Sequence, residues 1–180
     1  MGQTDAGFTA VEIMMVVAIA GIVAAVSVPS ISGAMQQYAL NGAREIVAAE
    51  IRLARFTAVS TNRTVRVRFD CPGAAQLRII EVVGDPIVDS AADRCSETAY
   101  PFPDQDPNTD PNADGRIVRL PQGAQFETIQ DLEITPRGRI TPLTGCPTCA
   151  PTAPPATIAV TNGADTRTIA VSASGRVELP

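Results

Sequence analysis

FTAVEIMMVVAIAGIVAAVSV, residues 8–28, decides the fold of this 180-residue chain, because a single charge, Glu12, interrupts an otherwise apolar run. As an α-helix that rises about 1.5 Å per residue, the run spans roughly 31 Å, close to the hydrocarbon thickness of a bilayer. The uncharged stretch after Glu12 continues to Ala43, and Arg44 is the next charged residue. We therefore predict that residues 8–28 form a membrane-spanning helix.

Three interpretations of this segment stay open. A secretory signal peptide fits the small residues Ala25-Val26-Ser27, but residues 1–7 carry only the side-chain charge of Asp5 in place of a basic region. A plain membrane anchor explains the length and leaves Glu12 unexplained, because a carboxylate in a spanning segment costs roughly 2.5–3.5 kcal/mol. The third interpretation gives Glu12 a partner.

Gly7-Phe8-Thr9, followed by Glu12 and the apolar run, resembles the processing site of type IV prepilins and type II secretion pseudopilins. The resemblance implies that a prepilin peptidase cuts after Gly7, removes residues 1–7 as a leader and N-methylates Phe8. The leader departs from the family in lacking Lys and Arg. Cleavage would place an amine on Phe8, one turn before Glu12. In a bundle of such helices, Glu12 of one subunit could pair with the amine of the next and set the axial register.

The helix is expected to cover residues 8–60, with a kink at Pro29 and an amphipathic continuation beyond it. After Pro29 the apolar positions step by three or four, which predicts one core-facing stripe. The stripe consists of Ile31, Met35, Tyr38, Gly42, Ile46, Ala49, Leu53 and Phe56. The opposite, polar side consists of Arg44, Glu45, Glu50, Arg52 and Arg55.

Residues 61–180 predict a globular, β-rich domain, because the apolar period changes to two after Asn62. The pair Asn162-Gly163 predicts a hairpin turn. Between the strands, residues 84–115 are expected to form a long acidic loop. The strand candidates are residues 64–69, 77–83, 117–120, 126–134, 156–161, 166–172 and 176–179. The predicted class is α+β, a long N-terminal helix packed on a small antiparallel sheet domain.

The composition argues against catalysis. The chain has no His, which removes every Ser-His, Cys-His and His-ligated metal site within it. We find no nucleophile and base for an anchored envelope enzyme, and no metal or cofactor is expected. All 14 basic residues are Arg, and 19 acids give a net charge of −5, so nucleic-acid binding is not expected of the surface as a whole.

Three short patterns in the domain resemble one branch of the pseudopilins. They are Leu-Ala-Arg-Phe-Thr-Ala-Val at 53–59, Thr-Pro-Arg-Gly-Arg at 135–139 and Ser-Gly-Arg-Val at 174–177. Together they are similar to the H-type minor pseudopilins of type II secretion and their FimT-like fimbrial relatives (the GspH/FimT-like family). The resemblance implies a structural subunit near a filament tip that supports protein secretion. It also implies insertion in the bacterial inner membrane with the domain in the periplasm, and assembly with other minor and major pseudopilins.

A second function follows from the FimT-like branch, which includes proteins that bind DNA during uptake through a C-terminal Gly-Arg-x-Arg motif. Here the position reads Gly-Arg-Val-Glu at 175–178, and the acid Glu178 stands where the second Arg should be. A carboxylate repels phosphate, so DNA binding is the alternative and not the main hypothesis. Its candidate contacts are Arg137, Arg139 and Arg176.

Four cysteines stand at 71, 95, 146 and 149. A domain outside the cytoplasmic membrane lies in an oxidising compartment, and an even count there favours disulfides. Of three possible pairings we prefer Cys71–Cys95 with Cys146–Cys149. A four-cysteine zinc site and a redox role for the Cys146–Cys149 CxxC are the alternatives.

The acidic segment 104–115 contains the opening of a calcium loop. Asp110, Asn112 and Asp114 alternate as oxygen ligands, and Gly115 could make the sharp turn. The twelfth position is Pro121, so the bidentate Glu of such a loop is missing. A solvated acidic, turn-rich loop is the other interpretation.

Overall fold

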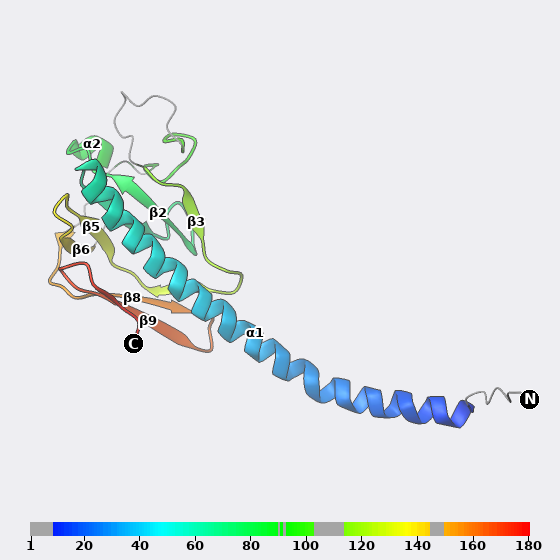
Figure 1. Ribbon diagram of the computed structural model, residues 1–180. Coiled ribbons are helices and arrows are strands. Elements are labelled where there is room, and N and C mark those ends of the chain that lie inside the picture. Colours follow the sequence, from blue (N-terminus) through cyan, green and yellow to red (C-terminus); the bar gives the residue numbers. More distant parts are fainter. Residues whose placement is uncertain (1–8, 90, 92, 103–113, 145–149) are drawn as a thin grey trace, which may run out of the picture. The chain divides into compact units, whose positions relative to one another are not determined.

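The computed structural model describes residues 9–89, 91, 93–102, 114–144 and 150–180 (Figure 1). The chain divides into two compact units, Met1–Tyr38 and Ala39–Pro180. Helix α1, Ala10–Thr61, begins in the first unit and ends in the second. A short helix α2, Pro86–Asp89, lies in the segment that was expected to be a loop. The α+β class with a long N-terminal helix and an antiparallel sheet domain is confirmed.

The strands form two sheets in which all neighbours are antiparallel. The larger sheet has the order β3-β2-β1-β5-β6-β7 and the smaller one the order β10-β9-β8-β4. Their bounds are β1 Val65–Phe69, β2 Gln76–Glu81, β3 Ile117–Arg119, β4 Gln125–Thr128, β5 Asp131–Ile134, β6 Ile140–Thr144, β7 Ala150–Pro151, β8 Ala156–Thr161, β9 Thr166–Val171 and β10 Val177–Glu178.

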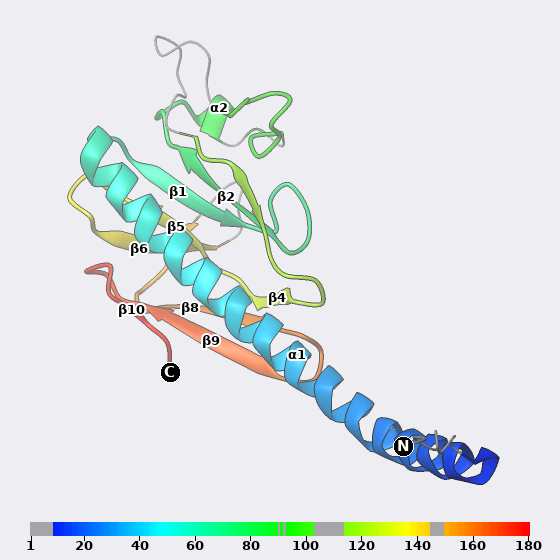
Figure 2. The same cartoon turned by 45° about the vertical axis from the view of Figure 1, so that its right-hand side comes forward.

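The part of α1 within Ala39–Pro180 packs against both sheets and completes one hydrophobic core (Figure 2). Its side chains in this core are Leu40, Ala43, Val47, Ile51, Ala54 and Ala58, each at most 1% exposed. The predicted stripe is wrong. Tyr38, Leu53 and Phe56 are 77%, 47% and 69% exposed. The helix carries two parallel apolar stripes, and the one rich in alanine is buried because small side chains let a helix approach two sheets closely.

The predicted strand 126–134 is two strands that belong to different sheets. β4 pairs with β8, and β5 pairs with β1 and β6. The register of β4 shifts between Phe126 and Thr128, and the chain crosses to the other sheet before Asp131. Alternation alone could not reveal this crossing, because apolar residues of both strands contribute to the same core.

The hairpin at Asn162-Gly163 is confirmed. β8 and β9 pair from Ala156↔Val171 to Thr161↔Thr166. The side-chain oxygen of Asn162 accepts hydrogen bonds from the amides of Ala164 and Asp165, at 3.0 and 2.8 Å. Gly163 has φ 88°, which is the left-handed conformation that a hairpin turn of this kind requires.

In the first unit, α1 is continuous through Pro29, so the helix does not end there, and the kink stays a prediction. Within the described part of the chain, no helix combines the length and the apolarity needed to cross a membrane. The predicted span 8–28 begins at Phe8, which lies outside the described residues.

Candidate functional site

The described side chains of α1 from Val11 to Val23 are largely exposed and mostly apolar. Nine large apolar residues here are at least 54% exposed: Val11, Ile13, Met14, Met15, Val16, Val17, Ile19, Ile22 and Val23. Soluble proteins rarely expose such a contiguous surface unless another molecule or a lipid phase covers it. This half of the helix is therefore a candidate interaction surface.

Glu12 lies in the first turn of α1, where Thr9 caps the helix. The amide of Glu12 donates to the Thr9 carbonyl at 3.1 Å and to Thr9 Oγ1 at 3.3 Å. Among the described residues, no cation pairs with the exposed Glu12 carboxylate. The partial positive charge at the N-terminus of a helix stabilises a nearby carboxylate, so the local structure alone accounts for an acid at this position. Gly7 and Phe8 lie outside the described residues, so cleavage and methylation stay predictions.

The turns that carry Arg137, Arg139 and Arg176 are built alike. In residues 135–139, the amide of Thr135 donates to the Arg139 carbonyl at 3.0 Å, and the amide of Gly138 donates to the Thr135 carbonyl at 2.8 Å. In residues 172–176 the equivalent bonds measure 3.0 and 2.9 Å, with Gly175 in the place of Gly138. Both are three-residue hairpin loops with a left-handed glycine, and an arginine follows each glycine.

Arg55 of α1 brings the two turns together. Its Nε donates to the Gly138 carbonyl at 3.2 Å. A Cβ built on Gly138 would lie 3.0 Å from Arg55 Nε, and one built on Gly175 would lie 2.7 Å from Arg55 Cδ. The amide of Ile140 also donates to the Ala173 carbonyl at 2.9 Å and so joins the two turns directly. Arg55 was expected on the polar side of the helix, and its role between the two turns was not predicted. The two Gly-Arg pairs were the only signal.

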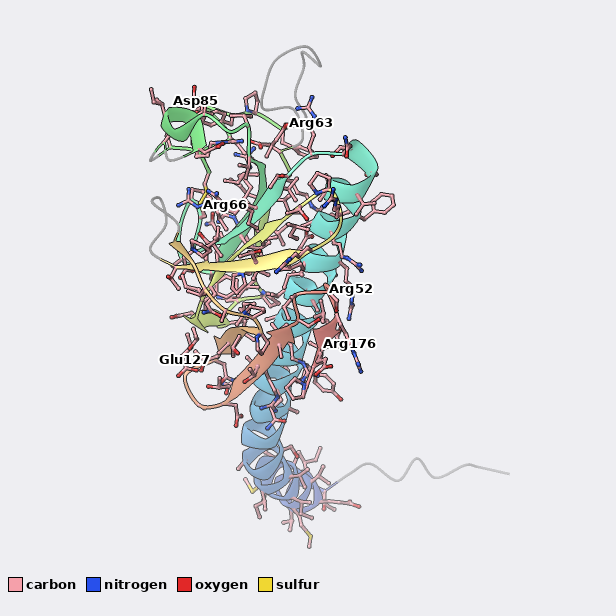
Figure 3. All side chains as sticks on the ribbon, turned by 90° about the vertical axis from the view of Figure 1, so that its left-hand side faces the viewer. Arg52, Arg63, Arg66, Asp85, Glu127 and Arg176 are labelled. Carbon is pink, nitrogen blue, oxygen red and sulfur yellow. A yellow bond between two sulfur atoms is a disulfide. The ribbon has the colours of Figure 1, made fainter. Side chains whose placement is uncertain are left out.

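The result is an arginine patch at the junction of α1 and both sheets. We define it by the exposed residues Arg52, Arg55, Arg137, Arg139 and Arg176. Arg52 and Arg55 line a shallow groove of about 350 Å³ together with Phe56, Val59 and Gly175. Figure 3 shows Arg52 and Arg176 on the same side of the molecule. Glu178 pairs with Arg176 at 3.1 Å and offsets the charge of that one arginine. The other four arginines of the patch have no ion pair among the described residues, so arginine outnumbers acid in the patch although the chain as a whole is acidic.

The Cys71–Cys95 disulfide is confirmed. It ties the end of β1 to the segment 93–102. Cys146 and Cys149 lie outside the described residues, so their pairing stays a prediction. Among the described residues, no group of His, Cys, Asp or Glu is arranged to hold a metal ion.

Two buried arginines, Arg78 and Arg94, anchor the segment between β2 and β3, most of which was expected to be a long acidic loop over residues 84–115. Arg78, on β2, donates to the carbonyls of Gly115, Cys95 and Tyr100 at 2.8, 3.1 and 2.6 Å. Burial lowers the pKa of Arg78, and the nearby Asp114 raises it in part. This part of the segment is therefore fixed on the sheet by three backbone acceptors.

Asp114 belongs to the same anchor and not to an open acidic loop. Arg94 is fully buried and contacts both carboxylate oxygens of Asp114, one of them at 2.8 Å from Nη2. The Glu81 amide also donates to Asp114 Oδ1 at 2.7 Å, and the Arg94 guanidinium lies 4.4 Å from the centre of the Tyr100 ring. Both oxygens that a calcium ion would need are thus engaged. The other candidate ligands, Asp110 and Asn112, lie outside the described residues.

The family model described as type II transport protein GspH matches residues 43–175. The chain belongs to the GspH family of type II transport proteins. The match covers most of the helix–sheet unit and leaves out the N-terminal motif, so GspH membership does not depend on the resemblance at Gly7 to Glu12. Both arginine-bearing turns lie within the GspH match or at its edge.

The chain is similar to two crystal forms of the type IV minor pilin FimU from Pseudomonas aeruginosa strain PAO1. One has a TM-score of 0.48 and 16% identity, covering 80% of this GspH-family chain and 90% of FimU. The other has a TM-score of 0.45 and 16% identity, covering 78% and 92%. Among curated proteins, none matches the sequence.

Proposed function

We propose that this GspH-family chain is a minor pseudopilin, a structural subunit near the tip of a type II secretion pseudopilus or a type IV pilus. One observation carries the proposal: a domain of the GspH family is joined through a single helix to an exposed apolar segment that begins with Thr9 and Glu12. The role is assembly without catalysis.

Maturation and location follow from the N-terminal motif. Prepilin peptidase cuts after Gly7 and methylates Phe8, and residues 8–28 hold the chain in the inner membrane with the domain in the periplasm. Glu12 then pairs with the Phe8 amine of a neighbouring subunit, which offsets the cost of burying both charges. Extraction of the apolar helix into the filament exchanges lipid for the helices of other minor and major pseudopilins.

The profile of exported proteins tests this proposal. A deletion strain should lose several proteins from the culture supernatant, and the wild-type gene should restore them. Glu12→Ala should fail to restore export, whereas Glu45→Ala, which removes an exposed acid from the same helix, should succeed. An unchanged supernatant would contradict the secretion role and leave the type IV pilus.

DNA uptake is the second candidate function, and the arginine patch favours it. The sequence names Arg137, Arg139 and Arg176 together as candidate DNA contacts, and the two turns that bear them meet at Arg55. If the patch binds DNA, affinity for duplex DNA should fall steeply with salt, because bound arginines release counterions from phosphates. Replacing the three arginines with alanine should reduce the affinity and the salt slope, whereas Arg119→Ala on the far edge strand β3 should not. Equal binding by both variants would exclude this function.

A further inference from the structure

A second groove runs along α1 and shares no lining residue with the groove of the arginine patch. It has a volume of about 380 Å³ and lies between α1 and the segment that leads into β3. The side chains that matter are Leu53 and Thr57 of α1, Ile79 of β2, Phe102, and the charged residues Glu50 and Arg116. All belong to the Ala39–Pro180 unit.

The walls of the groove are apolar and open. Leu53 and Phe102 are 47% and 48% exposed, while Ile79 is buried at 4%. Gly115 contributes no side chain, and a Cβ there would lie 3.3 Å from Ile79 Cβ. The groove therefore offers apolar contacts to a side chain that enters it, and no side chain blocks it at Gly115.

Glu50 supplies the charge of the groove. The residue is 8% exposed, and its nearest cation is Arg116, whose Nη2 lies 3.8 Å from the carboxylate and whose side chain is 69% exposed. At this distance the pair is a long ion pair with, at best, a weak hydrogen bond from Arg116 to the Glu50 carboxylate. Burial raises the pKa of Glu50, and Arg116 offsets this only in part. A buried carboxylate with so little compensation is costly, and a cation of better geometry would stabilise it.

We propose that this groove receives the side chain of an Arg or Lys from a neighbouring pilin-like subunit. The methylene stem lies between Leu53 and Phe102, and the cationic head contacts the Glu50 carboxylate. Long cationic side chains suit such a site because their stems are apolar and their heads form charge-assisted hydrogen bonds. Arg116 moves into solvent at little cost, since its pair with Glu50 is long and exposed.

The contact is heterologous, because the groove of one subunit meets a different surface of the next. The occupant is a different pilin-like subunit, so a second copy of this chain is not expected in the groove. The inference rests on the proposed function, which supplies the neighbouring pilin-like subunit.

A photoactivatable residue placed at Leu53 of the full-length chain, in its native envelope, tests the contact. The expected product is an adduct with another pilin-like subunit, and the cross-linked peptide of that subunit contains Arg or Lys. Glu50→Gln should lower the yield roughly tenfold, because a neutral amide loses the charge-assisted contact. Arg116→Ala should leave the yield unchanged or raise it, because the competing cation is removed.

A second photoactivatable residue at Val17, in the N-terminal half of α1, separates the two levels of the proposal. Adducts at Val17 without adducts at Leu53 would overturn the groove contact and keep the subunit role. Adducts at neither position would overturn both. A Leu53 adduct that is insensitive to Glu50→Gln, that weakens with Arg116→Ala, or that joins two copies of this chain would also overturn the proposed contact.

Discussion

Asp114→Asn should destabilise the Ala39–Pro180 unit by about 3–5 kcal/mol. The substitution keeps the size of the side chain and removes the charge that faces Arg94, which has no exposed surface. Arg94 would remain buried with an amide nitrogen or a single neutral oxygen in place of two carboxylate oxygens. The loss also weakens the bond from the Glu81 amide to Asp114 Oδ1. Domains of this size are stable by only about 5–15 kcal/mol in total, so the effect should be large.

Urea unfolding of the full-length chain in detergent, followed by brief proteolysis at each urea concentration, measures this loss. The midpoint should fall by about 2 M for Asp114→Asn. Asp93→Asn is the matched control, because this exposed neighbour of Arg94 should change the stability by less than about 0.5 kcal/mol. The double variant Arg94→Met with Asp114→Leu should be more stable than either single one. A loss below about 1 kcal/mol for Asp114→Asn would refute the anchoring role of the pair.

Three further predictions concern other parts of the unit. Cys71→Ser should lower the unfolding free energy by about 3–4 kcal/mol in the same urea assay, because the disulfide closes a loop across 24 positions of sequence. A wild-type protein that loses no stability on reduction of the disulfide would contradict this. Glu50→Gln should raise the melting temperature at about pH 7 and leave it unchanged at about pH 4. Burial raises the pKa of Glu50, so the folded state binds this proton more tightly than the unfolded state does. The stability of the wild type therefore falls as the pH rises past the ordinary pKa of a glutamate, and the glutamine variant has no such loss. A variant that melts at the same temperature as the wild type at both pH values would contradict this. Gly175→Ala should lower the unfolding free energy more than Gly123→Ala does. Both glycines have a left-handed φ, but only a Cβ at Gly175 would clash with Arg55. In an Arg55→Ala background the two substitutions should therefore lower the unfolding free energy equally.

The sequence was sufficient where one period dominates. The strand at 65–69 and the hairpin around Asn162 follow from alternation and from a turn pair with a known preference. The length of α1 also follows from an unbroken run without strong helix breakers except Pro29. In these segments local preference and tertiary structure agree, so no knowledge of distant contacts was needed.

The sequence was insufficient where two local solutions compete. α1 has two apolar stripes, and the larger side chains of Tyr38 and Phe56 favoured the wrong one. Which stripe is buried depends on how closely the sheets approach α1, and the local sequence pattern contains no information about that distance. β6 was missed because Pro142 lies within it and a proline argues against a strand. The structure accommodates it, since the Pro142 carbonyl accepts the Thr152 amide at 2.8 Å and no amide is required of the proline.

The candidate site divides in the same way. Arg137, Arg139 and Arg176 were found from short Gly-Arg patterns, and the structure places their turns together. Arg55 and Glu50 were missed because a charged residue on a helix is usually solvated, and only the packing of turns and segments against α1 gives these two a defined environment. The same holds for Asp114, whose partner Arg94 is 20 positions away in the sequence.

Maturation as a prepilin is tested most directly by the mass of the N-terminal peptide of the chain isolated from its native envelope. The peptide should begin at Phe8 and carry one methyl group on its α-amine, and deletion of the prepilin peptidase should restore a peptide that begins at Met1. A mature chain that begins at Met1 in the presence of the peptidase, or beyond Ser27 after signal-peptide cleavage, would contradict assembly through Phe8 and Glu12.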